Sequence, residues 1–167
     1  YAFHLIVTDP SPAVLGTELP QLIRDGFTSF KIYMTYDDLK LADAQILDVL
    51  EVARREGGLV MVHAENSDAI AWLTARLTAS GRTAPKFHAV SRPMPVEREA
   101  THRAITLSEL LDVPILIVHV SGGEAVEQIR WAQGRGLNIY AETCPQYLFL
   151  TADALGAEGY HGAKCVC

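Results

Sequence analysis

The sequence has few of the features that mark membrane proteins, secreted proteins or nucleic-acid-binding proteins. Its 167 residues include 14 Lys and Arg against 20 Asp and Glu, which argues against binding of nucleic acid through bulk positive charge. No apolar run approaches the roughly 20 residues of a membrane-spanning helix. Three cysteines are few and odd in number, so we expect a reducing cytoplasm rather than a disulfide framework.

What the sequence does contain is a regular alternation of short apolar runs and longer helical patterns, within an ordinary globular composition of 49% apolar and 20% charged residues. Strands are expected where the runs are apolar and β-branched, at residues 2–8, 27–34, 59–64, 114–120 and 137–142. Helices are expected between and after them, at 13–25, 43–56, 66–80, 95–111 and 124–135. This alternation is typical of βαβ units.

Two local features interrupt or punctuate the pattern. The segment 81–95 is rich in proline and basic residues and is long for a connection, so we expect a functional or interface loop there. Ser121 and Glu124 have the spacing of a capping box, which predicts a helix start directly after the fourth strand.

Five predicted strands in 167 residues give roughly 33 residues per unit, whereas a closed eight-stranded barrel needs about 250. Two α/β architectures therefore stay open: a small doubly wound sheet, or about five-eighths of a barrel. A flavodoxin-like binding module would need a glycine-rich phosphate-binding turn after the first strand, and residues 8–15 (TDPSPAVL) offer none.

Four polar residues lie in or directly after predicted strands, where both architectures place functional side chains. Lys31 lies inside an apolar strand, so its amine needs a partner or a modification. His63 and His119 each come at the end of a strand, and Glu142 ends the last one. Because the carboxyl ends of parallel strands meet at one edge, these side chains are expected to converge.

Each of these residues also has a purely structural interpretation. A single histidine at the end of a buried strand is more often a hydrogen-bonded core residue than a metal ligand. Glu142 is better interpreted as a partner of a ligand than as a ligand. The remaining histidines are expected to be structural or solvated, namely His4, His88, His102 and His161. Cys165 and Cys167 have a C-x-C spacing that is too weak to indicate a metal site.

Six segments together resemble the dihydropyrimidinase and D-hydantoinase group of cyclic amidohydrolases, in order, with natural spacing and over nearly the whole chain. They are FTSFKIYMTY (27–36), VMVHAEN (60–66), KFHAVSRP (86–93), EATHRAI (99–105), ILIVHVSG (115–122) and AETCPQYL (141–148). The resemblance implies a TIM-type (β/α)8 barrel of a metal-dependent hydrolase, present here as a partial barrel with about five parallel strands.

The resemblance also implies a binuclear metal centre, usually zinc, bridged by a carboxylated lysine. Lys31 matches the lysine that adds carbon dioxide to become N6-carboxylysine, and His63 and His119 match the two histidines of one metal. Tyr36 matches the tyrosine that contacts the substrate. A buried neutral amine can form a carbamate anion, which fits a lysine in a strand. Glu65 and Glu142 are candidate acceptors for the second N–H of these histidines.

The implied reaction is hydrolysis of a cyclic amide bond in a dihydropyrimidine or hydantoin ring, giving an N-carbamoyl amino acid. The family's pattern also includes a His-x-His pair on an earlier strand, an aspartate after the last strand and a small β domain, and the sequence contains no His-x-His. With Tyr1 in place of an initiator Met, this predicts that residues 1–167 are the central part of the catalytic barrel and are inactive alone. The whole protein is expected to be a homotetramer.

Two other functions share this fold. A non-catalytic scaffold of the collapsin-response-mediator type would have no reason to keep Lys31, His63 and His119 together. A sister enzyme, allantoinase or dihydroorotase, would use the same metal centre on another ring. The segments AETCPQYL and VHAEN favour the hydantoinase group and leave the ring substrate open.

Overall fold

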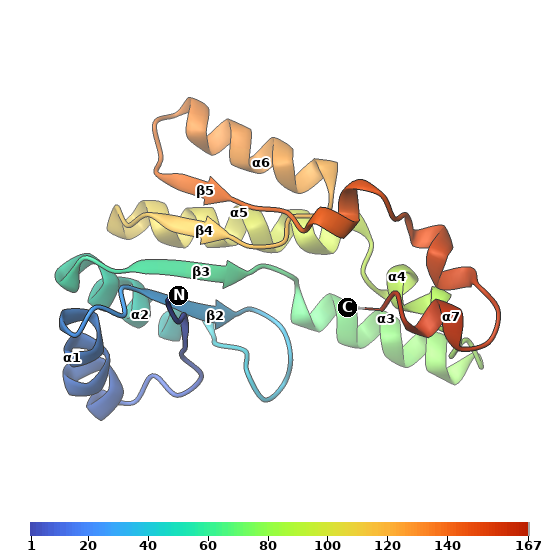
Figure 1. Ribbon diagram of the computed structural model, residues 1–167, viewed down its shortest axis with the longest axis horizontal. Coiled ribbons are helices and arrows are strands. Elements are labelled where there is room, and N and C mark those ends of the chain that lie inside the picture. The colour runs from blue at the N-terminus through green and yellow to red at the C-terminus, as the bar shows by residue number, and fades with distance from the viewer. Residues whose placement is uncertain (167) are drawn as a thin grey trace.

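The computed structural model describes residues 1–166, which form a parallel five-stranded sheet with helices packed against it (Figure 1). The strands are β1 (Leu5–Ile6), β2 (Ser29–Tyr33), β3 (Leu59–His63), β4 (Ile115–Ile117) and β5 (Ile139–Ala141). They lie in the order β1-β2-β3-β4-β5, and every neighbouring pair is parallel. The carboxyl ends of all five strands therefore lie at one edge of the sheet.

The helices that follow the strands form a layer in the same order as the strands. This layer contains α1 (Leu19–Arg24), α2 (Asp43–Glu56), α5 (Met94–Leu111) and α6 (Gly123–Gly134). Helix α2 packs against α1 and α5, and α5 packs against α6. In Figure 1, α2 and α5 lie behind the strands.

The order of the strands decides between the two architectures that the sequence leaves open. A doubly wound sheet reverses its strand order at a switch point and carries helices on both faces. Here the order is strictly sequential and the helices form one continuous layer. The fold is therefore a partial (β/α) barrel, and the doubly wound alternative is wrong.

The two faces of β2 show why this sequence forms such a sheet. Phe30 and Ile32 are fully buried in the main core, whereas Lys31 and Tyr33, which alternate with them, are only half-buried. Alternate side chains of a strand point to opposite faces. The apolar set therefore packs in the core, and Lys31 and Tyr33 belong to the other face. Lys31 is thus less buried than a position inside an apolar strand suggests.

Most helices have bounds close to those predicted, but one predicted helix is divided into two elements. Helix α2 has the predicted bounds, and its end is fixed by Gly57, whose φ of 78° suits glycine. The predicted helix 13–25 is instead a π-helical turn, η1 (Val14–Glu18), followed by α1. Pro20, near the start of α1, has no N–H to donate to the preceding turn, so one continuous α-helix cannot form there.

The loop predicted at 81–95 contains a short helix, α4 (Lys86–Ser91), so that prediction is wrong in part. Helix α4 packs against α3 (Ser67–Ala79) and against η3 (Ala152–Gly156), and η3 packs against α7 (Tyr160–Ala163). Between β5 and η3 lies one further short helix, η2 (Pro145–Leu148). Figure 1 shows α3, α4 and α7 grouped beyond the arrowheads of the strands, at the carboxyl edge.

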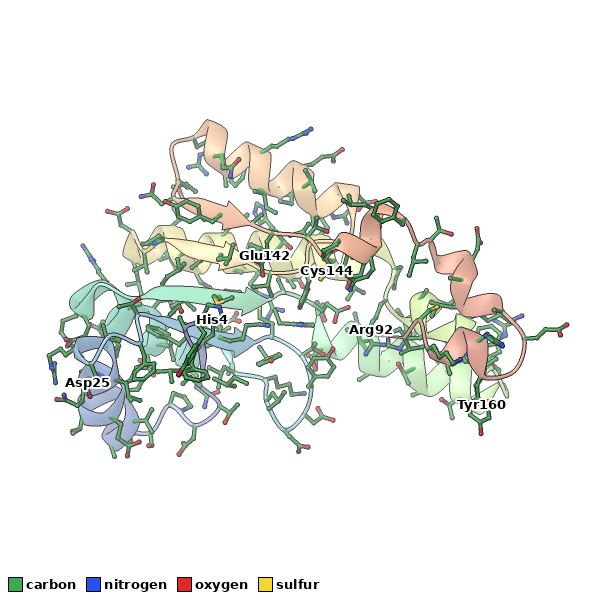
Figure 2. The ribbon with its side chains drawn as sticks, in the orientation of Figure 1. His4, Asp25, Arg92, Glu142, Cys144 and Tyr160 are labelled. Carbon is green, nitrogen blue, oxygen red and sulfur yellow. The ribbon has the colours of Figure 1, made fainter. Side chains whose placement is uncertain are left out.

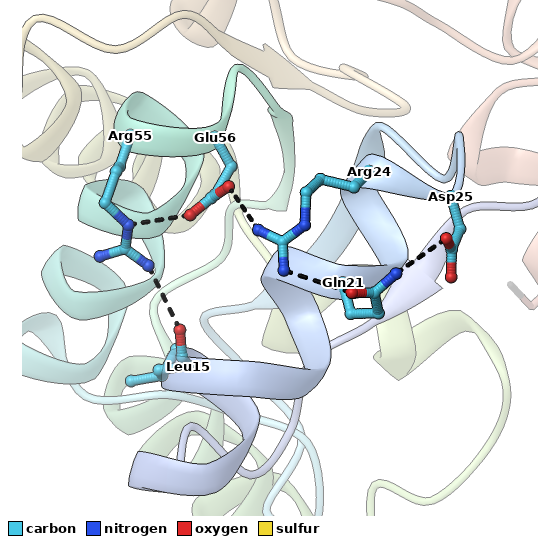
Figure 3. Close-up of polar contacts among 6 residues, drawn as sticks. All are labelled: Leu15, Gln21, Arg24, Asp25, Arg55 and Glu56. Atoms are coloured by element: carbon cyan, nitrogen blue, oxygen red, sulfur yellow. Dashed lines mark hydrogen bonds and ion pairs between the residues drawn. The ribbon is translucent and has the colours of Figure 1, made fainter.

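At the opposite end of the sheet, surface charges join α1 to α2 (Figure 3). Arg24 forms an ion pair of 3.2 Å with Glu56, which also pairs with Arg55 at 2.9 Å. Exposed pairs of this kind contribute about 0–1 kcal/mol each, so they support the packing of these helices without determining it.

No helix within residues 1–166 has both the length and the apolar character needed to cross a bilayer.

Candidate functional site

A cavity of about 650 Å³ opens at the carboxyl edge of the sheet. Lys31, Tyr36, His63 and His119 all line it, although they come from three different βα units. Figure 2 shows Glu142 and Cys144 just beyond β5, at the same edge. The cavity lies where a parallel α/β fold places its functional groups.

The two histidines are neighbours. His63 is the last residue of β3 and only 7% exposed, and His119 lies two residues beyond the end of β4. Their ring centroids are 4.5 Å apart with an interplanar angle of 70°. Parallel pairing of β3 with β4 brings both strand ends together, which explains how residues 56 positions apart meet.

Glu65 determines the orientation of the His63 ring. His63 Nε2 donates to Glu65 Oε2 at 2.8 Å, and the Glu65 carboxylate also lies 3.6 Å from Arg92 Nε. Burial alone would raise the pKa of Glu65, but the hydrogen bond and the charges of His63 and Arg92 hold it below its usual value. When the imidazole is neutral, a proton on Nε2 leaves the Nδ1 lone pair available to a metal ion.

His119 has an uncommon backbone conformation and a suppressed basicity. Its φ is 43°, in the left-handed region that non-glycine residues seldom occupy. Burial, reinforced by the positive charges of His63 and Lys31, lowers the pKa of His119 to about 4. The ring is therefore neutral near pH 7, which is the form that ligates metals.

Lys31 provides a half-buried amine in the lining of the cavity. Its Nζ lies 4.7 Å from the centroid of the Tyr33 ring. Desolvation by burial lowers the pKa of Lys31, and the charge of Glu142 opposes this effect only in part. A larger fraction of the Lys31 amine is therefore neutral, the nucleophilic form, than in a solvated lysine at the same pH.

Tyr36 stands at the rim of the cavity in a strained conformation. Its φ is 70°, its side chain is 39% exposed, and its ring centroid lies 5.1 Å from that of His63. The amides of Leu39 and Lys40 both donate to the Tyr36 carbonyl, at 2.9 and 2.8 Å, which closes the turn that holds the residue. Strained non-glycine residues of this kind cluster at functional sites.

The other polar residues singled out from the sequence have different positions. Glu142 follows β5, and its backbone carbonyl accepts from the Val120 amide at 2.8 Å. The acceptor for His63 is the Glu65 carboxylate. Outside this cavity, His4 contacts Ser29 Oγ at 2.6 Å.

The remaining histidines and Cys165 do not line this cavity either. His102 contacts Gln128 on α6, His88 contacts Arg92, and His161 lies in α7 near Cys165. Cys167, the other member of the C-x-C pair, lies outside the described residues.

The predicted capping box is wrong. Helix α6 begins at Gly123 with Gly122 as its N-cap, and Glu124 pairs with Arg98 at 2.7 Å instead of bonding back to the cap. The groups at this helix start are bound by Glu97, a residue of α5 that local spacing could not reveal.

The donor set of the cavity suits a metal ion in part. Two imidazoles and a lysine amine of lowered pKa meet there, which are nitrogen ligands and a carbamate precursor suited to zinc. Within residues 1–166, no group of three or more His, Cys, Asp and Glu side chains is arranged to hold a metal. The described residues therefore fit one side of a metal centre rather than a complete ligand set.

No protein-family model matches the chain. The D-hydantoinase of Rhizobium radiobacter is 46% identical over 167 residues, which are 99% of this chain and 36% of that protein. A solved D-hydantoinase superposes with a TM-score of 0.96 at 45% identity, over 98% of this chain and 36% of that one. The dihydropyrimidinase of Brevibacillus agri NCHU1002 has a TM-score of 0.95 at 44% identity, with the same coverage.

The likeness extends through both sequence and structure. The superpositions cover 98% of the chain. The chain spans 36% of the length of both D-hydantoinases named above. Over that span, the chain belongs to the D-hydantoinase and dihydropyrimidinase family.

Proposed function

We propose that the protein containing this chain hydrolyses a cyclic amide bond in a hydantoin or dihydropyrimidine ring, giving an N-carbamoyl amino acid. Residues 1–167 would form the central part of its catalytic barrel domain. The observation that carries the proposal is the meeting of Lys31, His63, His119 and Tyr36 in one cavity, in a chain 46% identical to a D-hydantoinase.

His63 and His119 would hold one divalent metal ion, and Lys31 as a carbamate would bridge it to a second, zinc being the expected metal. In forming the carbamate, the neutral Lys31 amine attacks carbon dioxide, a new N–C bond forms and one proton leaves the nitrogen. When bound, such a pair of metals lowers the pKa of a bridging water and polarises the ring carbonyl. The lowered pKa values of Lys31 and His119 support these assignments.

The remaining groups of the cavity would orient the ligands and the substrate. Glu65 keeps the proton on Nε2 of His63, which would leave the Nδ1 lone pair for a metal ion. Tyr36, at the rim, would donate its hydroxyl proton in a hydrogen bond to the oxygen that becomes negative as the ring amide is attacked. The turn 37–41 would form the entrance and influence which ring substituents enter.

The proposal is tested on the whole protein, purified with zinc and bicarbonate, by following ring opening of hydantoin and of dihydrouracil. Lys31→Ala is expected to abolish turnover and metal binding, because it removes the bridging group. His102→Ala, on α5 away from the cavity, is the matched control and should behave as the wild type. Full activity of the Lys31→Ala variant would refute the proposed mechanism.

The same assay separates the rival functions. A scaffold protein would open neither ring and bind no metal, whereas an allantoinase or dihydroorotase would act on its own ring and leave hydantoin intact. We further propose that the whole protein is a homotetramer acting on a small cyclic ureide, without nucleic acid or membrane, in the reducing cytoplasm. The free thiols of Cys144 and Cys165 support that compartment.

A further inference from the structure

Glu97 binds the turn that follows the candidate ligand His119. Its carboxylate accepts three hydrogen bonds, from the Ser121 amide at 2.8 Å, the Ser121 hydroxyl at 3.0 Å and the Gly122 amide at 2.7 Å. Glu97 lies in the first turn of α5, whereas Ser121 and Gly122 connect β4 to α6. One side chain therefore joins the start of one helix to the start of the next.

The backbone on both sides of His119 is held by hydrogen bonds. On the strand side, the Val118 amide donates to the Val62 carbonyl at 3.2 Å. Beyond His119, the Val120 amide donates to the Glu142 carbonyl at 2.8 Å, and Thr143 Oγ1 donates to the Val120 carbonyl at 2.7 Å. The bonds to Glu97 then fix the next two residues.

His119 needs such anchors because its φ of 43° is unfavourable for a residue with a Cβ atom. Conformations of this kind persist only where the surroundings impose them. The backbone of Val118 and Val120 is held by its neighbours on the sheet. Beyond Val120, the carboxylate of Glu97 supplies the anchor.

The carboxylate also fits closely against the turn. A Cβ atom added at Gly122 would lie 2.8 Å from Glu97 Oε2 and 3.3 Å from Met94 Cγ. The φ of Gly122 is −94°, which any residue can adopt, so the close approach of Glu97 and not the backbone conformation favours glycine there. A negative charge at the start of α6 is further stabilised by the helix dipole.

We propose that Glu97 is a positioning residue, whose carboxylate holds the 121–122 turn and thereby keeps the His119 imidazole beside that of His63. Its effect on metal binding rests on the proposed function, whereas its effect on the turn does not. Glu97 would act through the backbone of His119 and not by contact with the substrate.

The test compares Glu97→Gln and Glu97→Ala with Glu109→Gln in the whole protein. Glu109 also joins α5 to α6, through an ion pair of 2.8 Å with Arg135, but it lies several turns from the cavity end of α5. Removing it controls for the general loss of a contact between these helices. Gly122→Ala is a further variant, because its methyl group would displace the Glu97 carboxylate without removing it.

Two measurements are made on each variant. Hydrogen exchange of the Ser121 and Gly122 amides is followed in the metal-free protein, and cobalt(II) binding is titrated through its visible absorption. We expect both Glu97 variants and Gly122→Ala to exchange these amides at least about 10-fold faster and to bind cobalt(II) about 10-fold more weakly. Glu109→Gln should match the wild type in both. In the Glu97→Ala background, Gly122→Ala should add no further loss.

Unchanged exchange in the Glu97 variants would overturn the proposal, as would faster exchange with unchanged cobalt(II) affinity. Failure of the proposed function has a different signature. In that case the wild type and His119→Ala would bind cobalt(II) equally poorly, which overturns the role of Glu97 in metal binding, while the exchange rates still decide its role in the turn.

Discussion

At the scale of single residues, the surroundings of each imidazole in the cavity set its chemical state. Glu65 fixes the proton of His63, and burial keeps His119 neutral. Replacing Glu65, which contacts His63, should therefore weaken metal binding without removing a proposed metal ligand.

Replacing Glu65 with alanine tests the contact between Glu65 and His63. The variant should retain zinc about 10- to 100-fold more weakly than the wild type, because His63 loses the acceptor that fixes its tautomer. The measurement is zinc content after dialysis against a graded series of chelator concentrations. Glu124→Gln, which breaks an exposed ion pair with Arg98, is the control and should retain zinc normally. Equal retention by both variants would show that Glu65 does not orient a ligand.

Tyr36→Phe tests the donor at the rim of the cavity. Loss of one donor to a developing oxyanion lowers kcat by about 10²- to 10³-fold, and KM should change much less. Steady-state kinetics of hydantoin hydrolysis by the whole protein measures both constants. Tyr160→Phe, at an exposed position on α7, removes a hydroxyl away from the cavity and should leave kcat unchanged. A rise in KM with normal kcat would assign Tyr36 to ground-state binding instead.

The sequence makes some of these residues predictable and conceals others. Lys31, His63 and His119 could be predicted to converge because each lies in or just after a strand of a parallel sheet. Glu97 could not, because it binds a turn 24 residues further along the chain through packing of two helices. Local spacing pointed instead to Ser121 and Glu124, and tertiary contacts overrode that capping signal.

At the scale of elements, the same contrast holds for helices and strands. The helix 43–56 was predictable to the residue because its apolar spacing ends at a glycine pair. The division of 13–25 into η1 and α1 was not, since the apolar period continues across Pro20. Helix α4, within the predicted loop 81–95, is stabilised by packing against α3 and η3, and distant contacts of this kind leave no periodic signal.

The join between α2 and β3 is a close contact that one substitution can test. A Cβ atom at Gly58 would lie 2.6 Å from the ring of Phe30, which is fully buried in β2. Gly58→Ala should lower the free energy of unfolding by about 1–3 kcal/mol through overpacking, as urea denaturation would measure. Gly16→Ala, at a site with no neighbouring atom within 4 Å, is the control. A neutral Gly58→Ala would mean that Phe30 can move aside.

At the scale of the whole molecule, the strand order and the polar residues of the cavity both fit part of a (β/α) barrel. Five parallel strands in sequential order form a partial barrel, and its carboxyl edge carries two imidazoles and one amine. Composition and periodicity could predict the α/β class but not the sequential order, which depends on how the strands pair across the sheet.

Residues 1–167 expressed alone are expected to show no sustained ring opening of dihydrouracil, even with added zinc and bicarbonate. The reason is that the described side chains offer donors for only part of a binuclear centre. The whole protein, assayed under identical conditions, is the control. Sustained turnover by the isolated chain would contradict this account of the ligand set.

The central claim is that Lys31, His63 and His119 form one side of a metal centre. Anomalous X-ray diffraction at the zinc edge, on crystals of the whole protein grown with zinc and bicarbonate, tests it most directly. We predict one anomalous peak within bonding distance of both imidazoles and a second peak joined to it through a carbamate on Lys31 Nζ. Crystals in which Lys31 keeps a free amine and no zinc lies beside His63 and His119 would contradict the claim.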